Sequence, residues 1–226
     1  MNKVLVLGDS HSAVFDNSLW KNKAIYFSWN TVVVHGATLS GLNNPNSQTR
    51  EFDKFFNALK NFKYDAVVTL LGEVDCGFVI WYYAQRDDIN VYKAAEKAIE
   101  NYKNLLIEAS AKAKTFVISA PLPTIGGNET HGNVAQERSK IKSTQEERTK
   151  LTLYFNKKIH EFCLSNNIEF VDLDSVSMGE NGLISNTLIN QNKSDHHYNN
   201  NRGYISILEM NLLPKIMKSF NIKKYS

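Results

Sequence analysis

Short runs of apolar residues alternate with longer amphipathic stretches along the chain. The apolar runs lie at 3–7, 30–36, 65–72, 114–123 and 168–175. The first three end at, or directly before, a glycine. Continuous apolar runs of this length are typical of strands that are covered on both faces of a parallel sheet. We therefore predict five strands.

Stretches with apolar residues at helical spacing separate most of these runs. They occupy 47–62, 91–113, 139–167 and 203–220, the last as one final helix. Strands that alternate with helices predict a parallel sheet with helices on both faces. Because no repeat or linker interrupts the alternation, we predict one three-layer α/β/α domain spanning residues 1–226.

Composition agrees with a soluble globular protein. Of the 226 residues, 42% are hydrophobic and 22% are charged, and the formal net charge is only +3. We interpret the single basic cluster as a solvated helix end and expect no nucleic-acid partner. The cluster consists of Lys215, Lys218, Lys223 and Lys224.

Cysteine usage and the hydropathy of the N-terminus favour a cytoplasmic location. Cys76 and Cys163 are far apart and form no CxxC pair, which suits a reducing compartment. The N-terminal apolar stretch is too short for a signal peptide, and no apolar run reaches the length of a membrane span. We expect a cytoplasmic protein without membrane insertion.

Polar and titratable residues follow the predicted strands. The first strand runs into "GDSH" (8–11), the second into "HGAT" (35–38) and the third into "GEVDC" (72–76). A fourth block, "SDHHY" (194–198), comes just before the last helix. Ligands bind at the carboxyl ends of the strands in such folds, so we expect these blocks to form one site.

Two chemistries suit these residues. A serine hydroxyl needs a neighbouring base, a histidine can take up its proton, and a carboxylate can orient that histidine. Ser10 with Asp195 and either His196 or His197 supplies such a set. Alternatively, Asp9 and His11 belong to a metal site.

The metal alternative resembles the calcineurin-like phosphoesterases through Asp9-x-His11 and the block at 72–77. Such sites need further ligand blocks, Gly-Asn-His and Gly-His-x-His, and the sequence has neither. It also has no glycine loop of the GxGxxG or Walker type. We therefore predict neither a metal nor a cofactor.

The four blocks together resemble the SGNH (GDSL-type) hydrolase superfamily. The strings "GLNNPNS", "LGEVDCGFVIWYYA", "ERTKLTLYFN" and "DHHY" further resemble a bacterial branch associated with surface-polysaccharide biosynthesis. The resemblance implies a flavodoxin-like five-stranded sheet of order 2-1-3-4-5, with Ser10 as nucleophile. It favours His197 over His196 as the base, since Tyr198 follows it, although the family spacing is Asp-x-x-His.

The same resemblance implies an oxyanion hole, and here the sequence departs from the family. The backbone N–H groups of Ser10 and Gly36 are candidate donors, with Gly41 as the alternative glycine. The family's third donor is the asparagine of a Gly-x-Asn-Asp block, and Val74 stands at its position. Asn43 or Asn44 is a candidate substitute.

Further polar residues are candidates for binding the substrate. Glu73 and Asp75, two positions apart on a segment expected to be extended, would point to the same side. The substrate-binding candidates are Asp9, His11, Asn43, Glu73 and Asp75.

We expect an esterase or O-acyltransferase that acts on acyl, most simply acetyl, esters of a carbohydrate or polysaccharide. The alternatives are a catalytically silent glycan-binding or assembly module, which Val74 favours, and a metal-dependent phosphoesterase. The sequence leaves the acyl group, the sugar and the oligomeric state open.

Overall fold

A five-stranded parallel sheet forms the centre of the protein, seen here in a computed structural model that describes residues 1–44, 46–126, 141–192, 195–199 and 203–222. The strand order is β2-β1-β3-β4-β5, which confirms the predicted fold class. The strands are β1 (Asn2–Gly8), β2 (Phe27–Val33), β3 (Ala66–Leu70), β4 (Lys114–Ile118) and β5 (Glu169–Val171).

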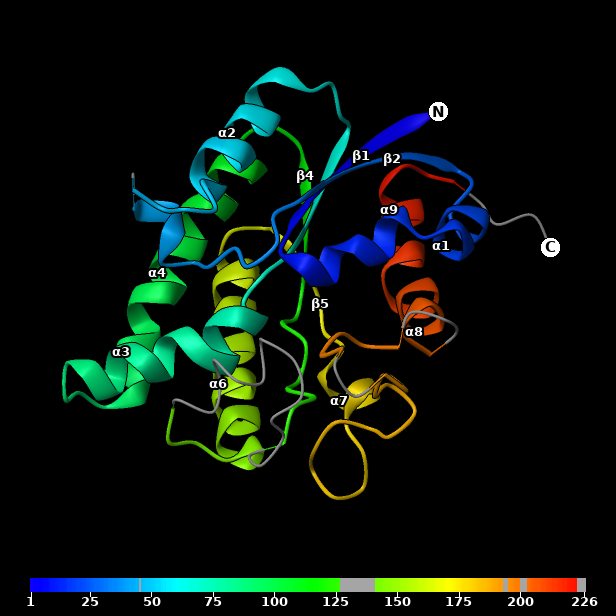
Figure 1. The fold of residues 1–226 in the computed structure, drawn as a ribbon. Helices are drawn as coiled ribbons and strands as arrows, with labels where there is room; N and C mark the ends of the chain where they lie inside the picture. The colour runs from blue at the N-terminus through cyan, green and yellow to red at the C-terminus, as the bar shows by residue number, and fades with distance from the viewer. Residues whose placement is uncertain (45, 127–140, 193–194, 200–202, 223–226) are drawn as a thin grey trace.

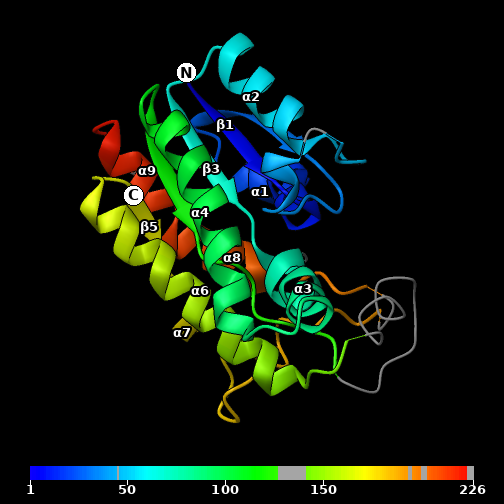
Figure 2. The same cartoon turned by 90° about the vertical axis from the view of Figure 1, so that its left-hand side faces the viewer.

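Helices cover both faces of the sheet (Figures 1 and 2). One face carries α2 (Glu51–Asn61), α4 (Val91–Ser110) and α6 (Gln145–Ser165). The other carries α1 (Ser18–Lys23), α8 (Gly203–Asn211) and α9 (Leu213–Ser219). The shorter elements are η1 (Ser10–Asp16), η2 (Gly41–Asn43), η3 (Asp75–Val79), α3 (Ile80–Arg86) and α7 (Asp174–Ser177).

The apolar strand runs supply two separate cores. Successive residues of a strand point to opposite faces, so β1 sends Leu5 and Leu7 into one core and Val4 and Val6 into the other. Both cores exclude solvent almost completely at these positions. This two-sided burial explains why the strands are continuously apolar instead of alternating.

Several predicted elements differ from the structure. The strands predicted at 114–123 and 168–175 end earlier, at Ile118 and Val171. The second strand occupies Phe27–Val33 instead of 30–36, because Asn2–Gly8 pairs with it in that register. The predicted final helix is divided into α8 and α9, and Pro214 lies in the first turn of α9. Proline has no N–H to donate, so it starts a helix far more readily than it continues one.

Two features of the surface bear on the expected partners. No helix in the described ranges is both long enough and apolar enough to span a bilayer. In the basic cluster, Lys215 forms an ion pair with Glu169, while Lys223 and Lys224 lie outside the described residues.

Candidate active site

A close-packed turn carries the chain from β1 to the first polar block. A Cβ on Gly8 would lie 2.5 Å from the carbonyl oxygen of Leu70 and 2.6 Å from Cβ of Ser12. Only glycine allows this approach of β1 and its turn to β3. Asp9 then caps η1, which begins at Ser10, and Ser10 remains 9% exposed.

Asp9 and His11 form a buried pair directly around Ser10. Oδ1 of Asp9 accepts the backbone N–H of His11 at 2.9 Å and lies 3.2 Å from Nδ1 of the same residue. Oε2 of Glu73 approaches this Nδ1 to 4.0 Å. All three side chains are almost completely buried. They therefore form a buried polar cluster next to Ser10 in the chain, with Asp9 as the direct partner of the His11 ring.

The fourth block, called the late block below and described over residues 195–198, repeats the same local arrangement. Oδ1 of Asp195 accepts the backbone N–H of His197 at 3.0 Å and lies 2.5 Å from Nδ1 of that ring. Its second oxygen, Oδ2, accepts the side-chain amide of Asn190 at 2.9 Å. The carboxylate thus orients the ring of His197, the histidine that the sequence favoured as the base.

Burial and neighbouring charge shape the protonation of this pair. Burial lowers the pKa of His197 below its usual value, and the nearby His11 acts in the same direction, against the attraction of Asp195. Burial would raise the pKa of Asp195, but its hydrogen bonds from His197 outweigh this effect and lower it. Near neutral pH, the pair is a neutral imidazole beside a carboxylate. Among the described atoms, Nε2 of His197 is buried without a hydrogen-bond partner, ready to accept a proton.

The two blocks meet at the carboxyl edge of the sheet. The ring centroids of His11 and His197 lie 4.7 Å apart, and that of His196 lies 4.2 Å from His197. Ser10 precedes His11 directly, so it lies beside this cluster. Within the described ranges, no hydrogen bond joins the Ser10 hydroxyl to an imidazole. Catalytic hydrogen bonds are often long before a substrate binds.

The two candidate oxyanion glycines have different surroundings. Gly36 is exposed in a left-handed turn after β2, with φ of +70°. The N–H of Gly41 already donates to Thr38, to its carbonyl oxygen at 3.1 Å and its hydroxyl at 3.0 Å. Gly41 is therefore a poor candidate for a donor, and Gly36 is the better one. Val74 is half-buried in the helical turn that follows Gly72.

The segment after β3 is helical, so the prediction that Glu73 and Asp75 lie on an extended stretch is wrong. Asp75 is fully buried, and its two oxygens lie 3.0 and 2.9 Å from the backbone nitrogen of Leu39. Burial raises the pKa of Asp75 to about 8, although this hydrogen bond opposes the shift. Asp75 thus anchors the loop after β2 and is enclosed away from any substrate.

A second carboxylate anchors the same loop and was missed in the sequence. Glu51 is fully buried and accepts the N–H of Thr38 at 3.1 Å, together with the hydroxyls of Ser47 and Thr49. Acidic residues are common in the first turn of any helix, so nothing distinguished Glu51 in the sequence. Together, Glu51 and Asp75 fix the backbone that follows Gly36.

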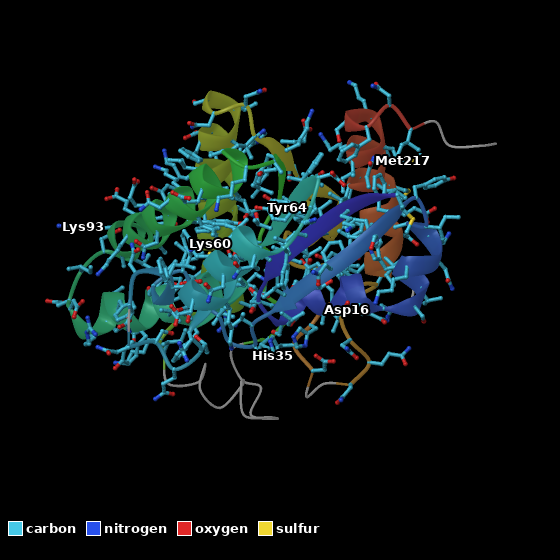
Figure 3. The ribbon with its side chains drawn as sticks, turned by 90° about the horizontal axis from the view of Figure 1, so that it is seen from above. Asp16, His35, Lys60, Tyr64, Lys93 and Met217 are labelled. Carbon is cyan, nitrogen blue, oxygen red and sulfur yellow. The ribbon has the colours of Figure 1, made fainter. Side chains whose placement is uncertain are left out.

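An open polar groove of about 870 Å³ lies beside this loop. Asn43 lines it, and its amide donates to Asn101, whose own amide donates to the carbonyl oxygen of Leu39 at 2.9 Å. Gly36 also lines the groove, whereas Ser10 does not. Lys93 projects outward from its α4 side (Figure 3). The groove therefore offers amides, hydroxyls and cations to a polar ligand.

The comparisons with known proteins agree on the fold. A GDSL-like lipase from Bacteroides thetaiotaomicron superimposes with a TM-score of 0.67 at 18% identity, over 96% of this chain and 89% of that chain. A carbohydrate acetylesterase family member from Sinorhizobium meliloti gives 0.61 at 14% identity, over 98% and 100% of the two chains. An extracellular lipase from Streptomyces rimosus gives 0.53 at 14% identity, over 93% and 100%. The chain has the fold of the GDSL-type hydrolases.

Sequence comparison adds nothing to this structural match. No protein-family model matches the chain, and neither does any curated protein. The identities to the GDSL-type structures are low enough that they establish the fold alone.

Proposed function

We propose that the protein is a serine-dependent enzyme of the SGNH type that hydrolyses or transfers acyl groups, most simply acetyl groups, on a carbohydrate. The observation that carries the proposal is the Asp195–His197 pair. Its buried, unpartnered Nε2 lies at the sheet edge where β1 delivers Ser10.

In the proposed reaction, the Ser10 hydroxyl attacks the ester carbonyl while Nε2 of His197 takes up its proton. The lowered pKa of His197 keeps the ring neutral and able to do so at neutral pH. Asp195 holds Nδ1–H and stabilises the imidazolium that forms. His197 then returns the proton to the departing sugar oxygen. The acyl-serine is resolved by water or by the hydroxyl of a second sugar.

The oxyanion of the tetrahedral intermediate needs donors that are already in position. We assign this role to the backbone N–H groups of Ser10 and Gly36. The buried carboxyl groups of Asp75 and Glu51, which hold the loop of Gly36, limit the reorganisation that the reaction requires. Val74 supplies no side-chain donor, so the hole has two donors and the turnover is expected to be slow.

The polar groove supports a carbohydrate as the substrate. Its lining includes Asn43, Asn44, Asn46, Ser47, Thr49 and Lys93, whose amides, hydroxyls and cation suit sugar hydroxyls. The acetylesterase among the structural relatives and the sequence resemblance to proteins of surface-polysaccharide biosynthesis agree with this substrate class. Acceptors other than water would make the same site a transferase.

Hydrolysis of an aryl acetate by the full-length protein tests the proposal. We expect activity that survives EDTA and that disappears in Ser10→Ala, with Ser110→Ala, far along α4, as the matched control. Equal background activity in wild type and Ser10→Ala, on aryl esters and on acetylated sugars, would identify a silent binding module instead. A phosphodiesterase activity that EDTA abolishes and manganese restores would identify a metallohydrolase.

A further inference from the structure

Three histidines converge at the carboxyl edge of the sheet. His11, His196 and His197 each offer a ring nitrogen, and these three atoms all lie within 4.8 Å of one another. We propose that the three imidazoles bind one divalent transition-metal ion, with Zn²⁺ as the representative, and that the bound ion inhibits the ester chemistry. Ion binding stands on the histidines alone, whereas the inhibition rests on the proposed function.

Carboxylates behind two of the rings support this assignment. Metal-ligating histidines usually donate their second ring N–H to a carboxylate or carbonyl, which fixes the tautomer and the ring orientation. Asp9 lies 3.2 Å from Nδ1 of His11, and Asp195 lies 2.5 Å from Nδ1 of His197. In each ring, Nδ1 faces the aspartate, so Nε2 points away from it. Nε2 of His197 is buried without a hydrogen-bond partner in the described structure.

The spacing requires only a small contraction. Zn–N bonds of about 2.0–2.1 Å in a tetrahedral site place ligand nitrogens about 3.4 Å apart, so each nitrogen needs to move by roughly 1 Å. His11 is buried and held by Asp9, but His196 and His197 are partly exposed and can adjust. Three protein ligands leave the fourth position to water.

The charge around the cluster suits a dication. Asp9 contacts the ring of His11, Asp195 contacts that of His197, and Oε2 of Glu73 lies 4.0 Å from Nδ1 of His11. Three carboxylates therefore lie against two of the three imidazoles. Imidazole nitrogens select zinc, copper, nickel or iron over magnesium and calcium, which prefer oxygen ligands.

The bound ion would act on the base of the proposed reaction. When Nε2 of His197 donates its lone pair to the metal, that pair is no longer available for the proton of Ser10. No covalent bond forms or breaks, so removal of the ion by a chelator restores the base. Zinc is thus expected to be a reversible inhibitor of this serine chemistry.

Calorimetric titration of EDTA-treated, dialysed, full-length protein with Zn²⁺ tests the site without any need for activity. We expect one ion per chain. We expect His11→Asn and His196→Asn each to weaken binding by at least the ~10–100-fold that loss of an outer partner costs. His35→Asn is the matched control, because His35 follows β2 at the same edge but is exposed and outside the cluster (Figure 3). Metal-free melting curves show whether each variant is folded.

The two parts of the proposal fail in distinguishable ways. Binding that is absent, or that the His11 and His196 variants retain unchanged, overturns the metal site even if Ser10-dependent esterase activity is present. Stoichiometric binding that these variants lose establishes the site even if the protein has no esterase activity. With both present, half-maximal inhibition at the zinc concentration that half-fills the site supports the inhibitory role. Activity that zinc leaves unchanged or increases overturns it.

Discussion

The Asp-x-His unit occurs twice at the candidate site, with the same local hydrogen bonds. Asp9 and Asp195 each accept a hydrogen bond from the backbone N–H of the histidine two residues later and contact Nδ1 of its ring. Aspartate readily folds back on the backbone two residues along, so this spacing pre-positions the ring. The same geometry explains why His197, and not the adjacent His196, is oriented by Asp195.

Asp195→Asn tests this orientation. An amide in place of the carboxylate no longer fixes the productive tautomer of His197, and it removes the negative charge that stabilises the imidazolium. We expect kcat for an aryl acetate to fall by about 10²–10⁴-fold, with the fold preserved. Asp53→Asn, on the exposed face of α2, is the control. Unchanged kcat in Asp195→Asn would remove Asp195 from the catalytic set.

Val74→Asn tests the missing oxyanion donor. If residue 74 faces the oxyanion, the new amide should raise esterase turnover by up to the ~10²–10³-fold that one donor contributes. The gain should be smaller, because burying an amide without its other partners costs about 1–3 kcal/mol. Val74→Leu keeps the apolar character and serves as the control. A folded Val74→Asn protein with wild-type turnover would show that the position lies away from the oxyanion.

The loop between β2 and α2 is held by two buried carboxyl groups. Asp75, in η3, accepts a hydrogen bond from the N–H of Leu39, and Glu51, in α2, accepts one from the N–H of Thr38. Gly41 passes directly over the Glu51 carboxylate, and a Cβ there would lie 1.7 Å from its Oε1. The close approach at Gly41 therefore serves the packing of the loop.

Gly41→Ala should destabilise this loop. The methyl group has to displace a buried carboxylate that has several partners, so we expect a loss of about 1–3 kcal/mol in the free energy of unfolding. Esterase activity should fall with it, because Gly36 belongs to the same loop. Gly179→Ala is the control, since a Cβ there has no neighbour closer than 3.3 Å. Urea unfolding measures both variants, and equal stability would contradict the packing argument.

The strands and the long helices were readable from the sequence because each depends on a local period. Both-face burial makes β1 and β3 continuously apolar, and α4 and α6 repeat their apolar residues at helical spacing. The helical start at Glu73 was missed, because the sequence around "GEVDC" carries no apolar period. The register that moves β2 three residues towards the N-terminus depends on pairing with β1, which no local pattern encodes.

In the candidate site too, some features were predictable from the sequence, whereas others depend on tertiary contacts. The sheet gathers Ser10 from β1, Gly36 from after β2 and the late block before α8 at one edge, as the order of strands predicts. The participation of Glu51 and the meeting of three imidazoles were not predictable, because both depend on tertiary distances between blocks.

Cys76 is fully buried, and burial raises the pKa of its thiol well above the usual value, which is typical of a cysteine that packs in the core.

The free energy of unfolding should depend on pH because of the buried Asp75 carboxyl group. In the unfolded chain this group loses its proton near pH 4. In the folded protein burial keeps the proton bound up to about pH 8. The folded state therefore binds more protons between these values, and the free energy of unfolding should decrease as the pH rises through that interval. Below about pH 4 both states are protonated and the penalty disappears.

Asp75→Asn isolates this contribution, because its side-chain oxygen still accepts the N–H of Leu39 but does not titrate. Asp174, whose pKa burial raises to about 7, adds to the slope in both proteins and cancels in the difference. The stability of Asp75→Asn relative to wild type should therefore increase between pH 5 and pH 8. One pKa unit corresponds to about 1.4 kcal/mol, so even a quarter of the shift is measurable by urea unfolding. Parallel pH profiles of the two proteins would show that Asp75 is ionised in the folded state and that its hydrogen bonds to the loop outweigh its burial.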